Sequence, residues 1–172
     1  GHVEDSMTYD YVDYGGNSAY LQFYNANEIV KYSYFTTNEP YYLRTVDGFV
    51  TEVDADEYNY NIKAVFTDDK LTIYLRDAEL YDELHLPPMV IGAYTEEDGY
   101  IYDFPVDIIV EGDSAITVAG STRGSNASNA INNLSTGLLT ISSVNNAKLT
   151  LQSISANGDT TTGVTLNSVG SV

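Results

Sequence analysis

The chain has 172 residues, 43% of them hydrophobic, with no Cys and a formal net charge of −18 from seven Lys and Arg against 25 Asp and Glu. This length suits one domain or two small ones, and sixteen Tyr and five Phe exclude disorder throughout. The charge disfavours nucleic acid and anionic membrane surfaces as partners, whereas basic proteins and neutral glycans fit it. The absence of Cys excludes thiol chemistry, and no apolar stretch is long enough for direct membrane insertion.

The first part of the chain predicts a series of short strands. Large β-forming side chains and turn signals recur at the spacing typical of a β-sandwich or barrel. Residues 77–84 fit a short helix or a strand equally well. The strands are expected at residues 18–24, 57–64, 70–76, 89–94 and 100–104, of which the last two form a hairpin across the turn at 96–99.

The second part of the chain is built from Ser, Thr, Asn, Gly and Ala. Aliphatic residues around a Thr predict half-buried strands in this part. Their spacing is irregular, so we do not infer a solenoid repeat from the sequence. These strands are expected at residues 115–118, 138–141, 148–151 and 163–166.

Aromatic content and charge both change near residues 104–114. All sixteen Tyr lie before residue 103, and the 68 residues after Phe104 (172 − 104) contain no aromatic side chain. Residues 1–113 carry 24 acidic and five basic side chains, whereas residues 114–172 carry one acidic and two. The sequence therefore predicts an acidic, Tyr-rich, antiparallel immunoglobulin-like β-sandwich over residues 1–110, followed by a second small β-domain over residues 111–172.

Catalytic chemistry finds little support in these residues. Nucleophilic catalysis would depend on His85, which lies between two Leu just before two Pro and is better explained as a structural or surface residue. Paired carboxylates, as in glycoside hydrolysis, cannot be selected from so many acids. Most of the acids lie in polar runs and not in the apolar pocket that a general acid requires. We therefore expect a non-catalytic protein, with a carboxylate-dependent glycoside hydrolase as an alternative.

Two acidic segments are candidate calcium sites. Ca²⁺ takes about six to eight hard oxygen ligands, often from a single loop. One segment supplies them within residues 54–59, and the other lies at the predicted domain junction; neither fits the EF-hand loop. The alternative is ordinary acidic turns, and no other cofactor is expected. The candidate ligands are Asp54, Asp56, Glu57, Asn59, Glu111 and Asp113.

The tyrosines are the most distinctive feature of the composition. Tyr offers a large rigid surface with a polar tip, which suits contact with a partner protein or a sugar ring. Tyrosines within predicted strands are better explained as core residues and cross-strand pairs. Those flanking the turn at 36–38 are the candidate ligand-binding residues: Tyr32, Tyr34, Tyr41 and Tyr42.

Residues 18–104 resemble a family of secreted immunoglobulin-like domains of uncharacterised function, found in surface lipoproteins of marine gamma-proteobacteria. The resemblance lies in the opening segment at 20–26, in the strand at 58–62 and in the segment at 86–94. It implies an envelope-anchored sandwich and supplies no catalytic residue. Residues 105–172 lie outside it.

These observations predict an extracellular or cell-envelope protein, secreted or anchored as a lipoprotein. Its expected role is adhesion or surface assembly through Tyr-rich contacts and edge-strand pairing with a protein or glycan partner or with another copy of itself. A carbohydrate-binding module is the first alternative. It predicts several Tyr in one exposed, planar row.

Overall fold

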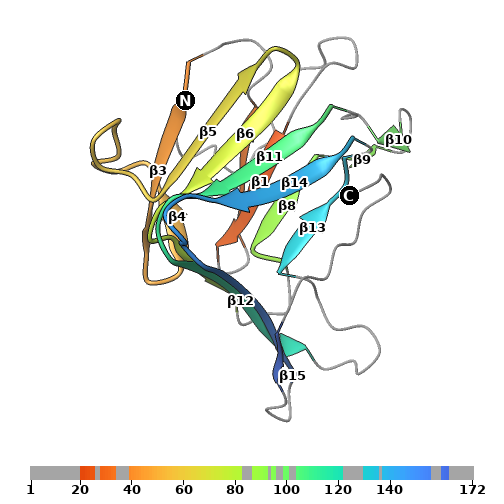
Figure 1. The fold of residues 1–172 in the computed structure, drawn as a ribbon. Helices are drawn as coiled ribbons and strands as arrows, with labels where there is room; N and C mark the ends of the chain where they lie inside the picture. The colour runs from red at the N-terminus through yellow and green to blue at the C-terminus, as the bar shows by residue number, and fades with distance from the viewer. Residues whose placement is uncertain are drawn as a thin grey trace.

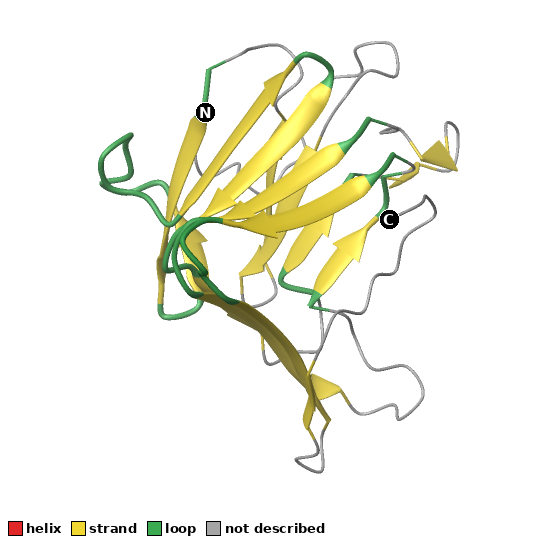
Figure 2. Cartoon of the chain, in the orientation of Figure 1, coloured by secondary structure: helices red, strands yellow, loops and turns green. Residues whose placement is uncertain are grey.

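A computed structural model of the chain shows an all-β protein with several sheets, none of which closes on itself (Figure 1). No helix occurs among the residues that the structure describes (Figure 2), and therefore none there is long and apolar enough to cross a membrane. The described residues are 20–25, 28–33, 39–82, 87–92, 94–95, 99–100, 104–121, 130–135, 137–155 and 160–162.

The strands are short and follow one another closely along the chain. Many alternate between buried and partly exposed residues, as expected for strands with one face on a core. The strands are β1 (Tyr20–Asn25), β2 (Glu28–Ser33), β3 (Tyr41–Val46), β4 (Phe49–Thr51), β5 (Ile62–Thr67), β6 (Lys70–Leu75), β7 (Glu79–Asp82), β8 (Met89–Ile91), β9 (Tyr94–Thr95), β10 (Gly99–Tyr100), β11 (Val106–Val110), β12 (Ser114–Ser121), β13 (Ile131–Asn133), β14 (Leu139–Ser143), β15 (Leu149–Ser155) and β16 (Thr160–Thr162).

The largest sheet has six strands in the order β14-β11-β6-β5-β3-β4. β6, β11 and β14 are parallel neighbours, and the remaining pairs are antiparallel. Two four-stranded sheets, β16-β15-β12-β7 and β13-β8-β1-β2, accompany it, together with the β9–β10 hairpin. β7, β12 and β15 are again parallel, as are β8 and β13.

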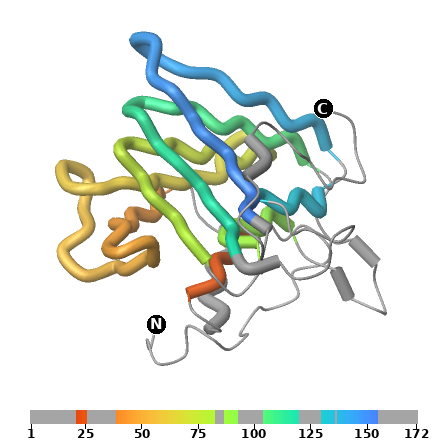
Figure 3. The backbone as a smooth tube through the Cα atoms, turned by 90° about the horizontal axis from the view of Figure 1, so that it is seen from below, coloured from red at the N-terminus to blue at the C-terminus, as the bar shows by residue number. Residues whose placement is uncertain are grey.

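Parallel pairing in these sheets stacks successive turns of the chain on one another. β6 leads through a corner into β7, β11 into β12, and β14 into β15, and the equivalent strands of each unit pair in register (Figure 3). We call these three strand–corner–strand units rungs. The arrangement is that of a short β-solenoid, whose first rung is covered by the antiparallel strand β5.

Aliphatic side chains from equivalent positions of the rungs form the core. In the six-stranded sheet Ile108 lies between Ile73 and Ile141, and Val106 lies between Leu71 and Leu139. All of these except Ile141, which packs against the core, are buried. The same stacking continues past the corner in Leu80, Ile116 and Leu151.

Two of the three corners contain residues with unusual backbone angles. Asp77 has a φ of 53°, and Asn145 and Asn146 have φ of 56° and 60°. Asp and Asn are the non-Gly residues that adopt this left-handed conformation most readily. These residues therefore turn the chain from β6 to β7 and from β14 to β15.

The observed architecture agrees with the predicted all-β class but not in every detail. An immunoglobulin-like sandwich is not confirmed, because parallel pairing between rungs replaces the antiparallel order expected from short consecutive strands. Residues 77–84, which fitted a helix or a strand, contain β7. The predicted strand at 163–166 lies outside the described residues.

Strands from both sides of the predicted break near 104–114 share sheets. β11 and β14 extend the six-stranded sheet that begins with β3 to β6, and the hydrophobic core contains residues of both halves. The change in composition near residue 110 therefore falls within a continuous packed structure.

Candidate functional site

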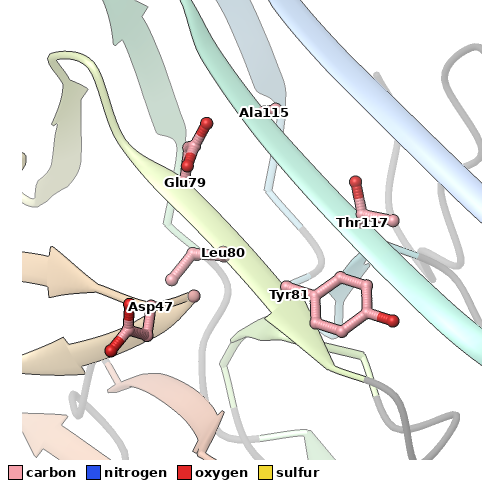
Figure 4. Close-up of a pocket in the computed structure, with 7 residues that line it drawn as sticks. Asp47, Glu79, Leu80, Tyr81, Ala115 and Thr117 are labelled. Atoms are coloured by element: carbon pink, nitrogen blue, oxygen red, sulfur yellow. The ribbon is translucent and has the colours of Figure 1, made fainter.

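A pocket lies between the β3–β4 turn and the outer face of β7 and β12. Its volume is about 350 Å³, at the lower end of the roughly 300–1,000 Å³ typical of small-ligand sites. This space accommodates a ligand of the size of one or two sugar rings. Asp47, Gly48, Glu79, Leu80, Tyr81, Ala115 and Thr117 line it (Figure 4).

A tight turn builds one wall of the pocket. Asp47 and Gly48 connect β3 to β4 with φ of 55° and 89°, the paired positive angles that favour Asp-Gly in two-residue hairpins. The main-chain carbonyl of Gly48 accepts a hydrogen bond from the amide of Tyr81 at 3.0 Å. This hydrogen bond fixes the turn against β7, the strand that supplies the opposite wall of the pocket.

Alternation along β7 points two polar side chains outward. Leu80 is buried in the core, so Glu79 and Tyr81 face away from it. The amide of Glu79 donates to the Thr45 hydroxyl at 3.2 Å. Register with β12 then places Tyr81 beside Thr117.

The pocket combines an aromatic ring with several hydrogen-bonding groups. Tyr81 is 40% exposed, and its ring extends across the strand toward Thr117 (Figure 4). The carboxyl groups of Asp47 and Glu79 are exposed and point in different directions. A ring face, two carboxylate acceptors and a hydroxyl are the groups that hold a polyhydroxylated ligand.

Comparisons with known proteins identify no relative. No family model, curated protein or solved structure matches the chain. The resemblance to secreted immunoglobulin-like domains stays a prediction from the sequence. Any functional conclusion therefore rests on the chemistry of this pocket and of the sheet surfaces.

The four candidate ligand-binding tyrosines do not form one group among the described side chains. Tyr41 and Tyr42 are neighbours on β3 and therefore face opposite sides of the sheet. The Tyr41 hydroxyl donates to Glu52 Oε2 at 2.9 Å, and burial followed by the nearby Glu52 charge raises the pKa of Tyr41 well above its ordinary value. Tyr32 lies on β2, its side chain outside the described part, and Tyr34 is outside it altogether.

The acidic segment at 54–59 forms a turn held by its own side chains. Asp56 Oδ1 accepts hydrogen bonds from the amides of Tyr58 and Asn59 at 2.8 and 2.9 Å. The Asn59 side-chain amide donates to the Asp54 carbonyl at 2.9 Å. Glu57 is exposed in the same turn. One oxygen expected to coordinate calcium, Asp56 Oδ1, is thus occupied in an Asx-type turn.

The two acids at the predicted junction also have structural partners. Glu111 Oε1 accepts the Tyr60 hydroxyl at 2.7 Å, and Asp113 Oδ1 accepts the Lys148 amide at 2.8 Å. Across the described residues, no group of three or more His, Cys, Asp or Glu is placed to hold a metal ion. Calcium binding therefore gains no support from the geometry of these six residues.

Sequence reasoning did not select the residues of the pocket. Two local signals point to them: the Asp47-Gly48 dipeptide is typical of a two-residue hairpin, and Glu79 to Asp82 alternate between outward and inward positions. The sequence contains no local signal for the contact between the β3–β4 turn and β7. That contact joins residues 33 positions apart (81 − 48).

Proposed function

We propose that the protein is a non-catalytic extracellular or cell-envelope module that binds a neutral glycan in the Tyr81 pocket and so mediates adhesion. The observation that carries this proposal is the half-open pocket with a solvent-accessible Tyr ring beside hydrogen-bonding groups. The placement outside the cell rests on the Ser-, Thr- and Asn-rich composition of the second half.

The chemistry of the pocket favours an uncharged sugar. The Tyr81 ring supplies an apolar face for the C–H groups of a pyranose. Asp47 and Glu79 accept hydrogen bonds from hydroxyl groups, and such charge-assisted bonds are about twice as strong as neutral ones. An anionic ligand would be repelled by the same two carboxylates.

The same carboxylates favour binding over hydrolysis. A glycosidase general acid needs a raised pKa, which usually comes from an apolar, buried environment. Asp47 and Glu79 are both exposed, and Figure 4 shows their carboxyl groups directed away from one another. A pair of acids flanking one glycosidic bond would instead converge on it.

A glycan array followed by calorimetric titration of the best ligand tests this function. Tyr81→Ala should weaken binding by about tenfold or more, since a pocket aromatic commonly contributes over 1 kcal/mol. Tyr58→Ala is the matched control, because Tyr58 is 84% exposed on the 52–60 loop and does not line the pocket. An equal loss in both variants, or release of reducing sugar on prolonged incubation, would contradict the proposal.

Surface assembly is a second candidate, favoured by the edge of the six-stranded sheet. Within the described part of the chain, β14 has a strand neighbour on one side only. The Val106 amide bonds to the Leu138 carbonyl and the Val144 amide to the Val110 carbonyl. Successive residues of a strand direct their main-chain N–H and C=O groups to alternate sides. The main-chain groups of Ser143 therefore point away from β11, to the outer edge of β14, where a strand of a second copy would pair.

Light scattering at increasing protein concentration tests assembly through this edge. Ser143→Pro removes an edge-facing amide, and Pro is tolerated on edge strands, so the mass of the assembly should fall to that of the monomer. Ser143→Ala keeps the amide and should assemble as the parent does. Monomeric behaviour of the parent protein at all concentrations would exclude this second role.

A further inference from the structure

Positive charge is concentrated on one face of the six-stranded sheet. Four of the seven Lys and Arg residues, Arg44, Lys63, Lys70 and Arg76, lie on β3, β5 and β6 or directly after β6. Their neighbours in the alternating pattern are buried core residues, so all four side chains face outward. In a chain with a net charge of −18, more than half of the cations are thus gathered on one face.

Tyrosines lie between these cations on the same face. Register places Tyr42 opposite Lys63 and Lys63 opposite Tyr74, so the three side chains form one row across β3, β5 and β6. Tyr60 and Arg76 adjoin this row, because the Tyr42 and Tyr60 rings lie 5.6 Å apart and the Arg76 guanidinium lies 3.8 Å from the Tyr60 centroid. We call Tyr42, Tyr60, Lys63, Tyr74 and Arg76 the tyrosine–cation face.

Two cations of the face, Lys63 and Arg76, pack against Tyr rings and not against carboxylates. Lys63 Nζ lies 4.8 Å from the centre of the Tyr74 ring, and Arg76 covers Tyr60. Among the described residues the one ion pair joins Lys70 to Asp107, at 2.9 Å. A guanidinium stacked on a ring keeps its N–H donors in its own plane, directed outward around the ring.

Several acids lie at the edge of the face. Glu111 accepts the Tyr60 hydroxyl, and Asp107 pairs with Lys70. Burial, followed by the charges of Glu57 and Asp56, raises the pKa of Tyr42. Lys63 and Arg76 therefore remain the groups on which an external anion would be held. Acids much farther than about 8 Å from the face are largely screened at physiological salt, so the acids at its edge are the ones that oppose an anion.

We propose that the tyrosine–cation face binds a uronic-acid polysaccharide, at a site separate from the Tyr81 pocket. Its carboxylates would pair with Lys63 and Arg76, and its sugar rings would lie along the row from Tyr42 to Tyr74. Those two residues are two strands apart, about 10 Å, which is close to the length of a disaccharide. A nucleic acid fits less well, because its denser charge meets stronger repulsion from the acidic chain.

Calorimetric titration with a purified oligogalacturonate tests the site. The same oligomer with its carboxyl groups methyl-esterified keeps the rings and removes the charge, and should bind about tenfold more weakly or less. Lys63→Gln and Arg76→Gln should each lower affinity for the charged oligomer by about tenfold, the effect of losing one charge-assisted contact. Lys148→Gln removes the same charge from the exposed β14–β15 corner and should leave affinity unchanged.

Several outcomes would overturn the proposal. These are absence of binding to the charged oligomer, equal losses in the Lys63, Arg76 and Lys148 variants, or displacement of the oligomer by polyglutamate or single-stranded DNA at lower concentration. Tyr81→Ala separates this site from the glycan pocket, because it should leave oligogalacturonate binding intact. Unchanged melting temperatures would show that the Gln variants are folded.

Discussion

The main-chain carbonyl of Gly48 is bonded to the amide of Tyr81, and a Cβ atom added at Gly48 would lie 2.9 Å from the Tyr81 Cβ. This close approach joins the β3–β4 turn, which builds one wall of the Tyr81 pocket, to the first rung of the solenoid. Gly48 is required for two reasons. A Cβ atom at this position would approach Tyr81 too closely, and the φ of 89° disfavours any L side chain.

Gly48→Ala should therefore lower the free energy of unfolding and disturb the pocket. Overpacking and backbone strain together are expected to cost about 1–3 kcal/mol, measured by urea denaturation. Asp47→Gly is the control, because Gly adopts the φ of 55° at that position without strain. Wild-type stability in Gly48→Ala would contradict the role assigned to this contact.

Ser114 makes the corner between β11 and β12 dependent on one hydroxyl. Its Oγ accepts the amide of Ala78 at 3.0 Å and donates to the Gly112 carbonyl at 2.9 Å, and the residue is 5% exposed. Ser114→Ala should cost about 1–3 kcal/mol, because it leaves the Ala78 amide buried without its acceptor. Chemical denaturation measures this cost, and Ser143→Ala, on an exposed residue, should change stability by less than about 0.5 kcal/mol.

The sequence predicted about half of the strands, but not the central strand β11 and not the way in which the strands stack. Paired residues on successive rungs are 35 and 33 positions apart in the six-stranded sheet (106 − 71 and 139 − 106) and 36 and 35 apart beyond the corner (116 − 80 and 151 − 116). The repeat is hard to see because residue identity recurs only in part. Leu71-Thr72-Ile73 returns as Leu139-Thr140-Ile141, but the strand between them carries Val106-Asp107-Ile108. A three-residue match that the middle rung does not share is too short a signal for parallel stacking.

Candidate sites were harder to predict than strands, because strand order decides which residues meet. Tyr42 was singled out for its position near a turn, yet its neighbours on the sheet are Lys63 and, one strand further, Tyr74. The two candidate tyrosines on β3, Tyr41 and Tyr42, face opposite sides of the sheet, as adjacent residues of a strand do. Cross-strand register, which composition cannot give, creates both the pocket and the tyrosine–cation face.

The ladder formed by Ile73, Ile108 and Ile141 allows a direct test of the stacked core. Ile108→Ala should lower stability by about 2–5 kcal/mol, because a fully buried side chain is removed from between two rungs. Ile109→Ala is the matched control on the outer face, where the residue is partly exposed, and should cost much less. Equal losses from the two variants in urea denaturation would mean that the rungs do not enclose a common core.

Alkaline pH should destabilise the protein through Tyr60. Burial, followed by the hydrogen bond to Glu111, raises the pKa of Tyr60 from 10.0 to about 12. The folded protein keeps this proton where the unfolded chain loses it, so the stabilisation is complete below pH 10 and is lost as pH rises toward 12. The raised pKa of Tyr41 acts in the same direction.

Denaturation of the parent and of Tyr60→Phe between pH 8 and pH 12 measures this effect. At pH 8 the variant should be less stable by about 1 kcal/mol, because the bond to Glu111 is lost. The difference should shrink as pH rises, since Phe has no proton to lose and the stability of the variant falls less steeply. Some decline remains in the variant through Tyr41, and Tyr41→Phe combined with Tyr60→Phe should flatten it further. Parallel pH profiles for the parent and Tyr60→Phe would show that Tyr60 does not titrate in this range.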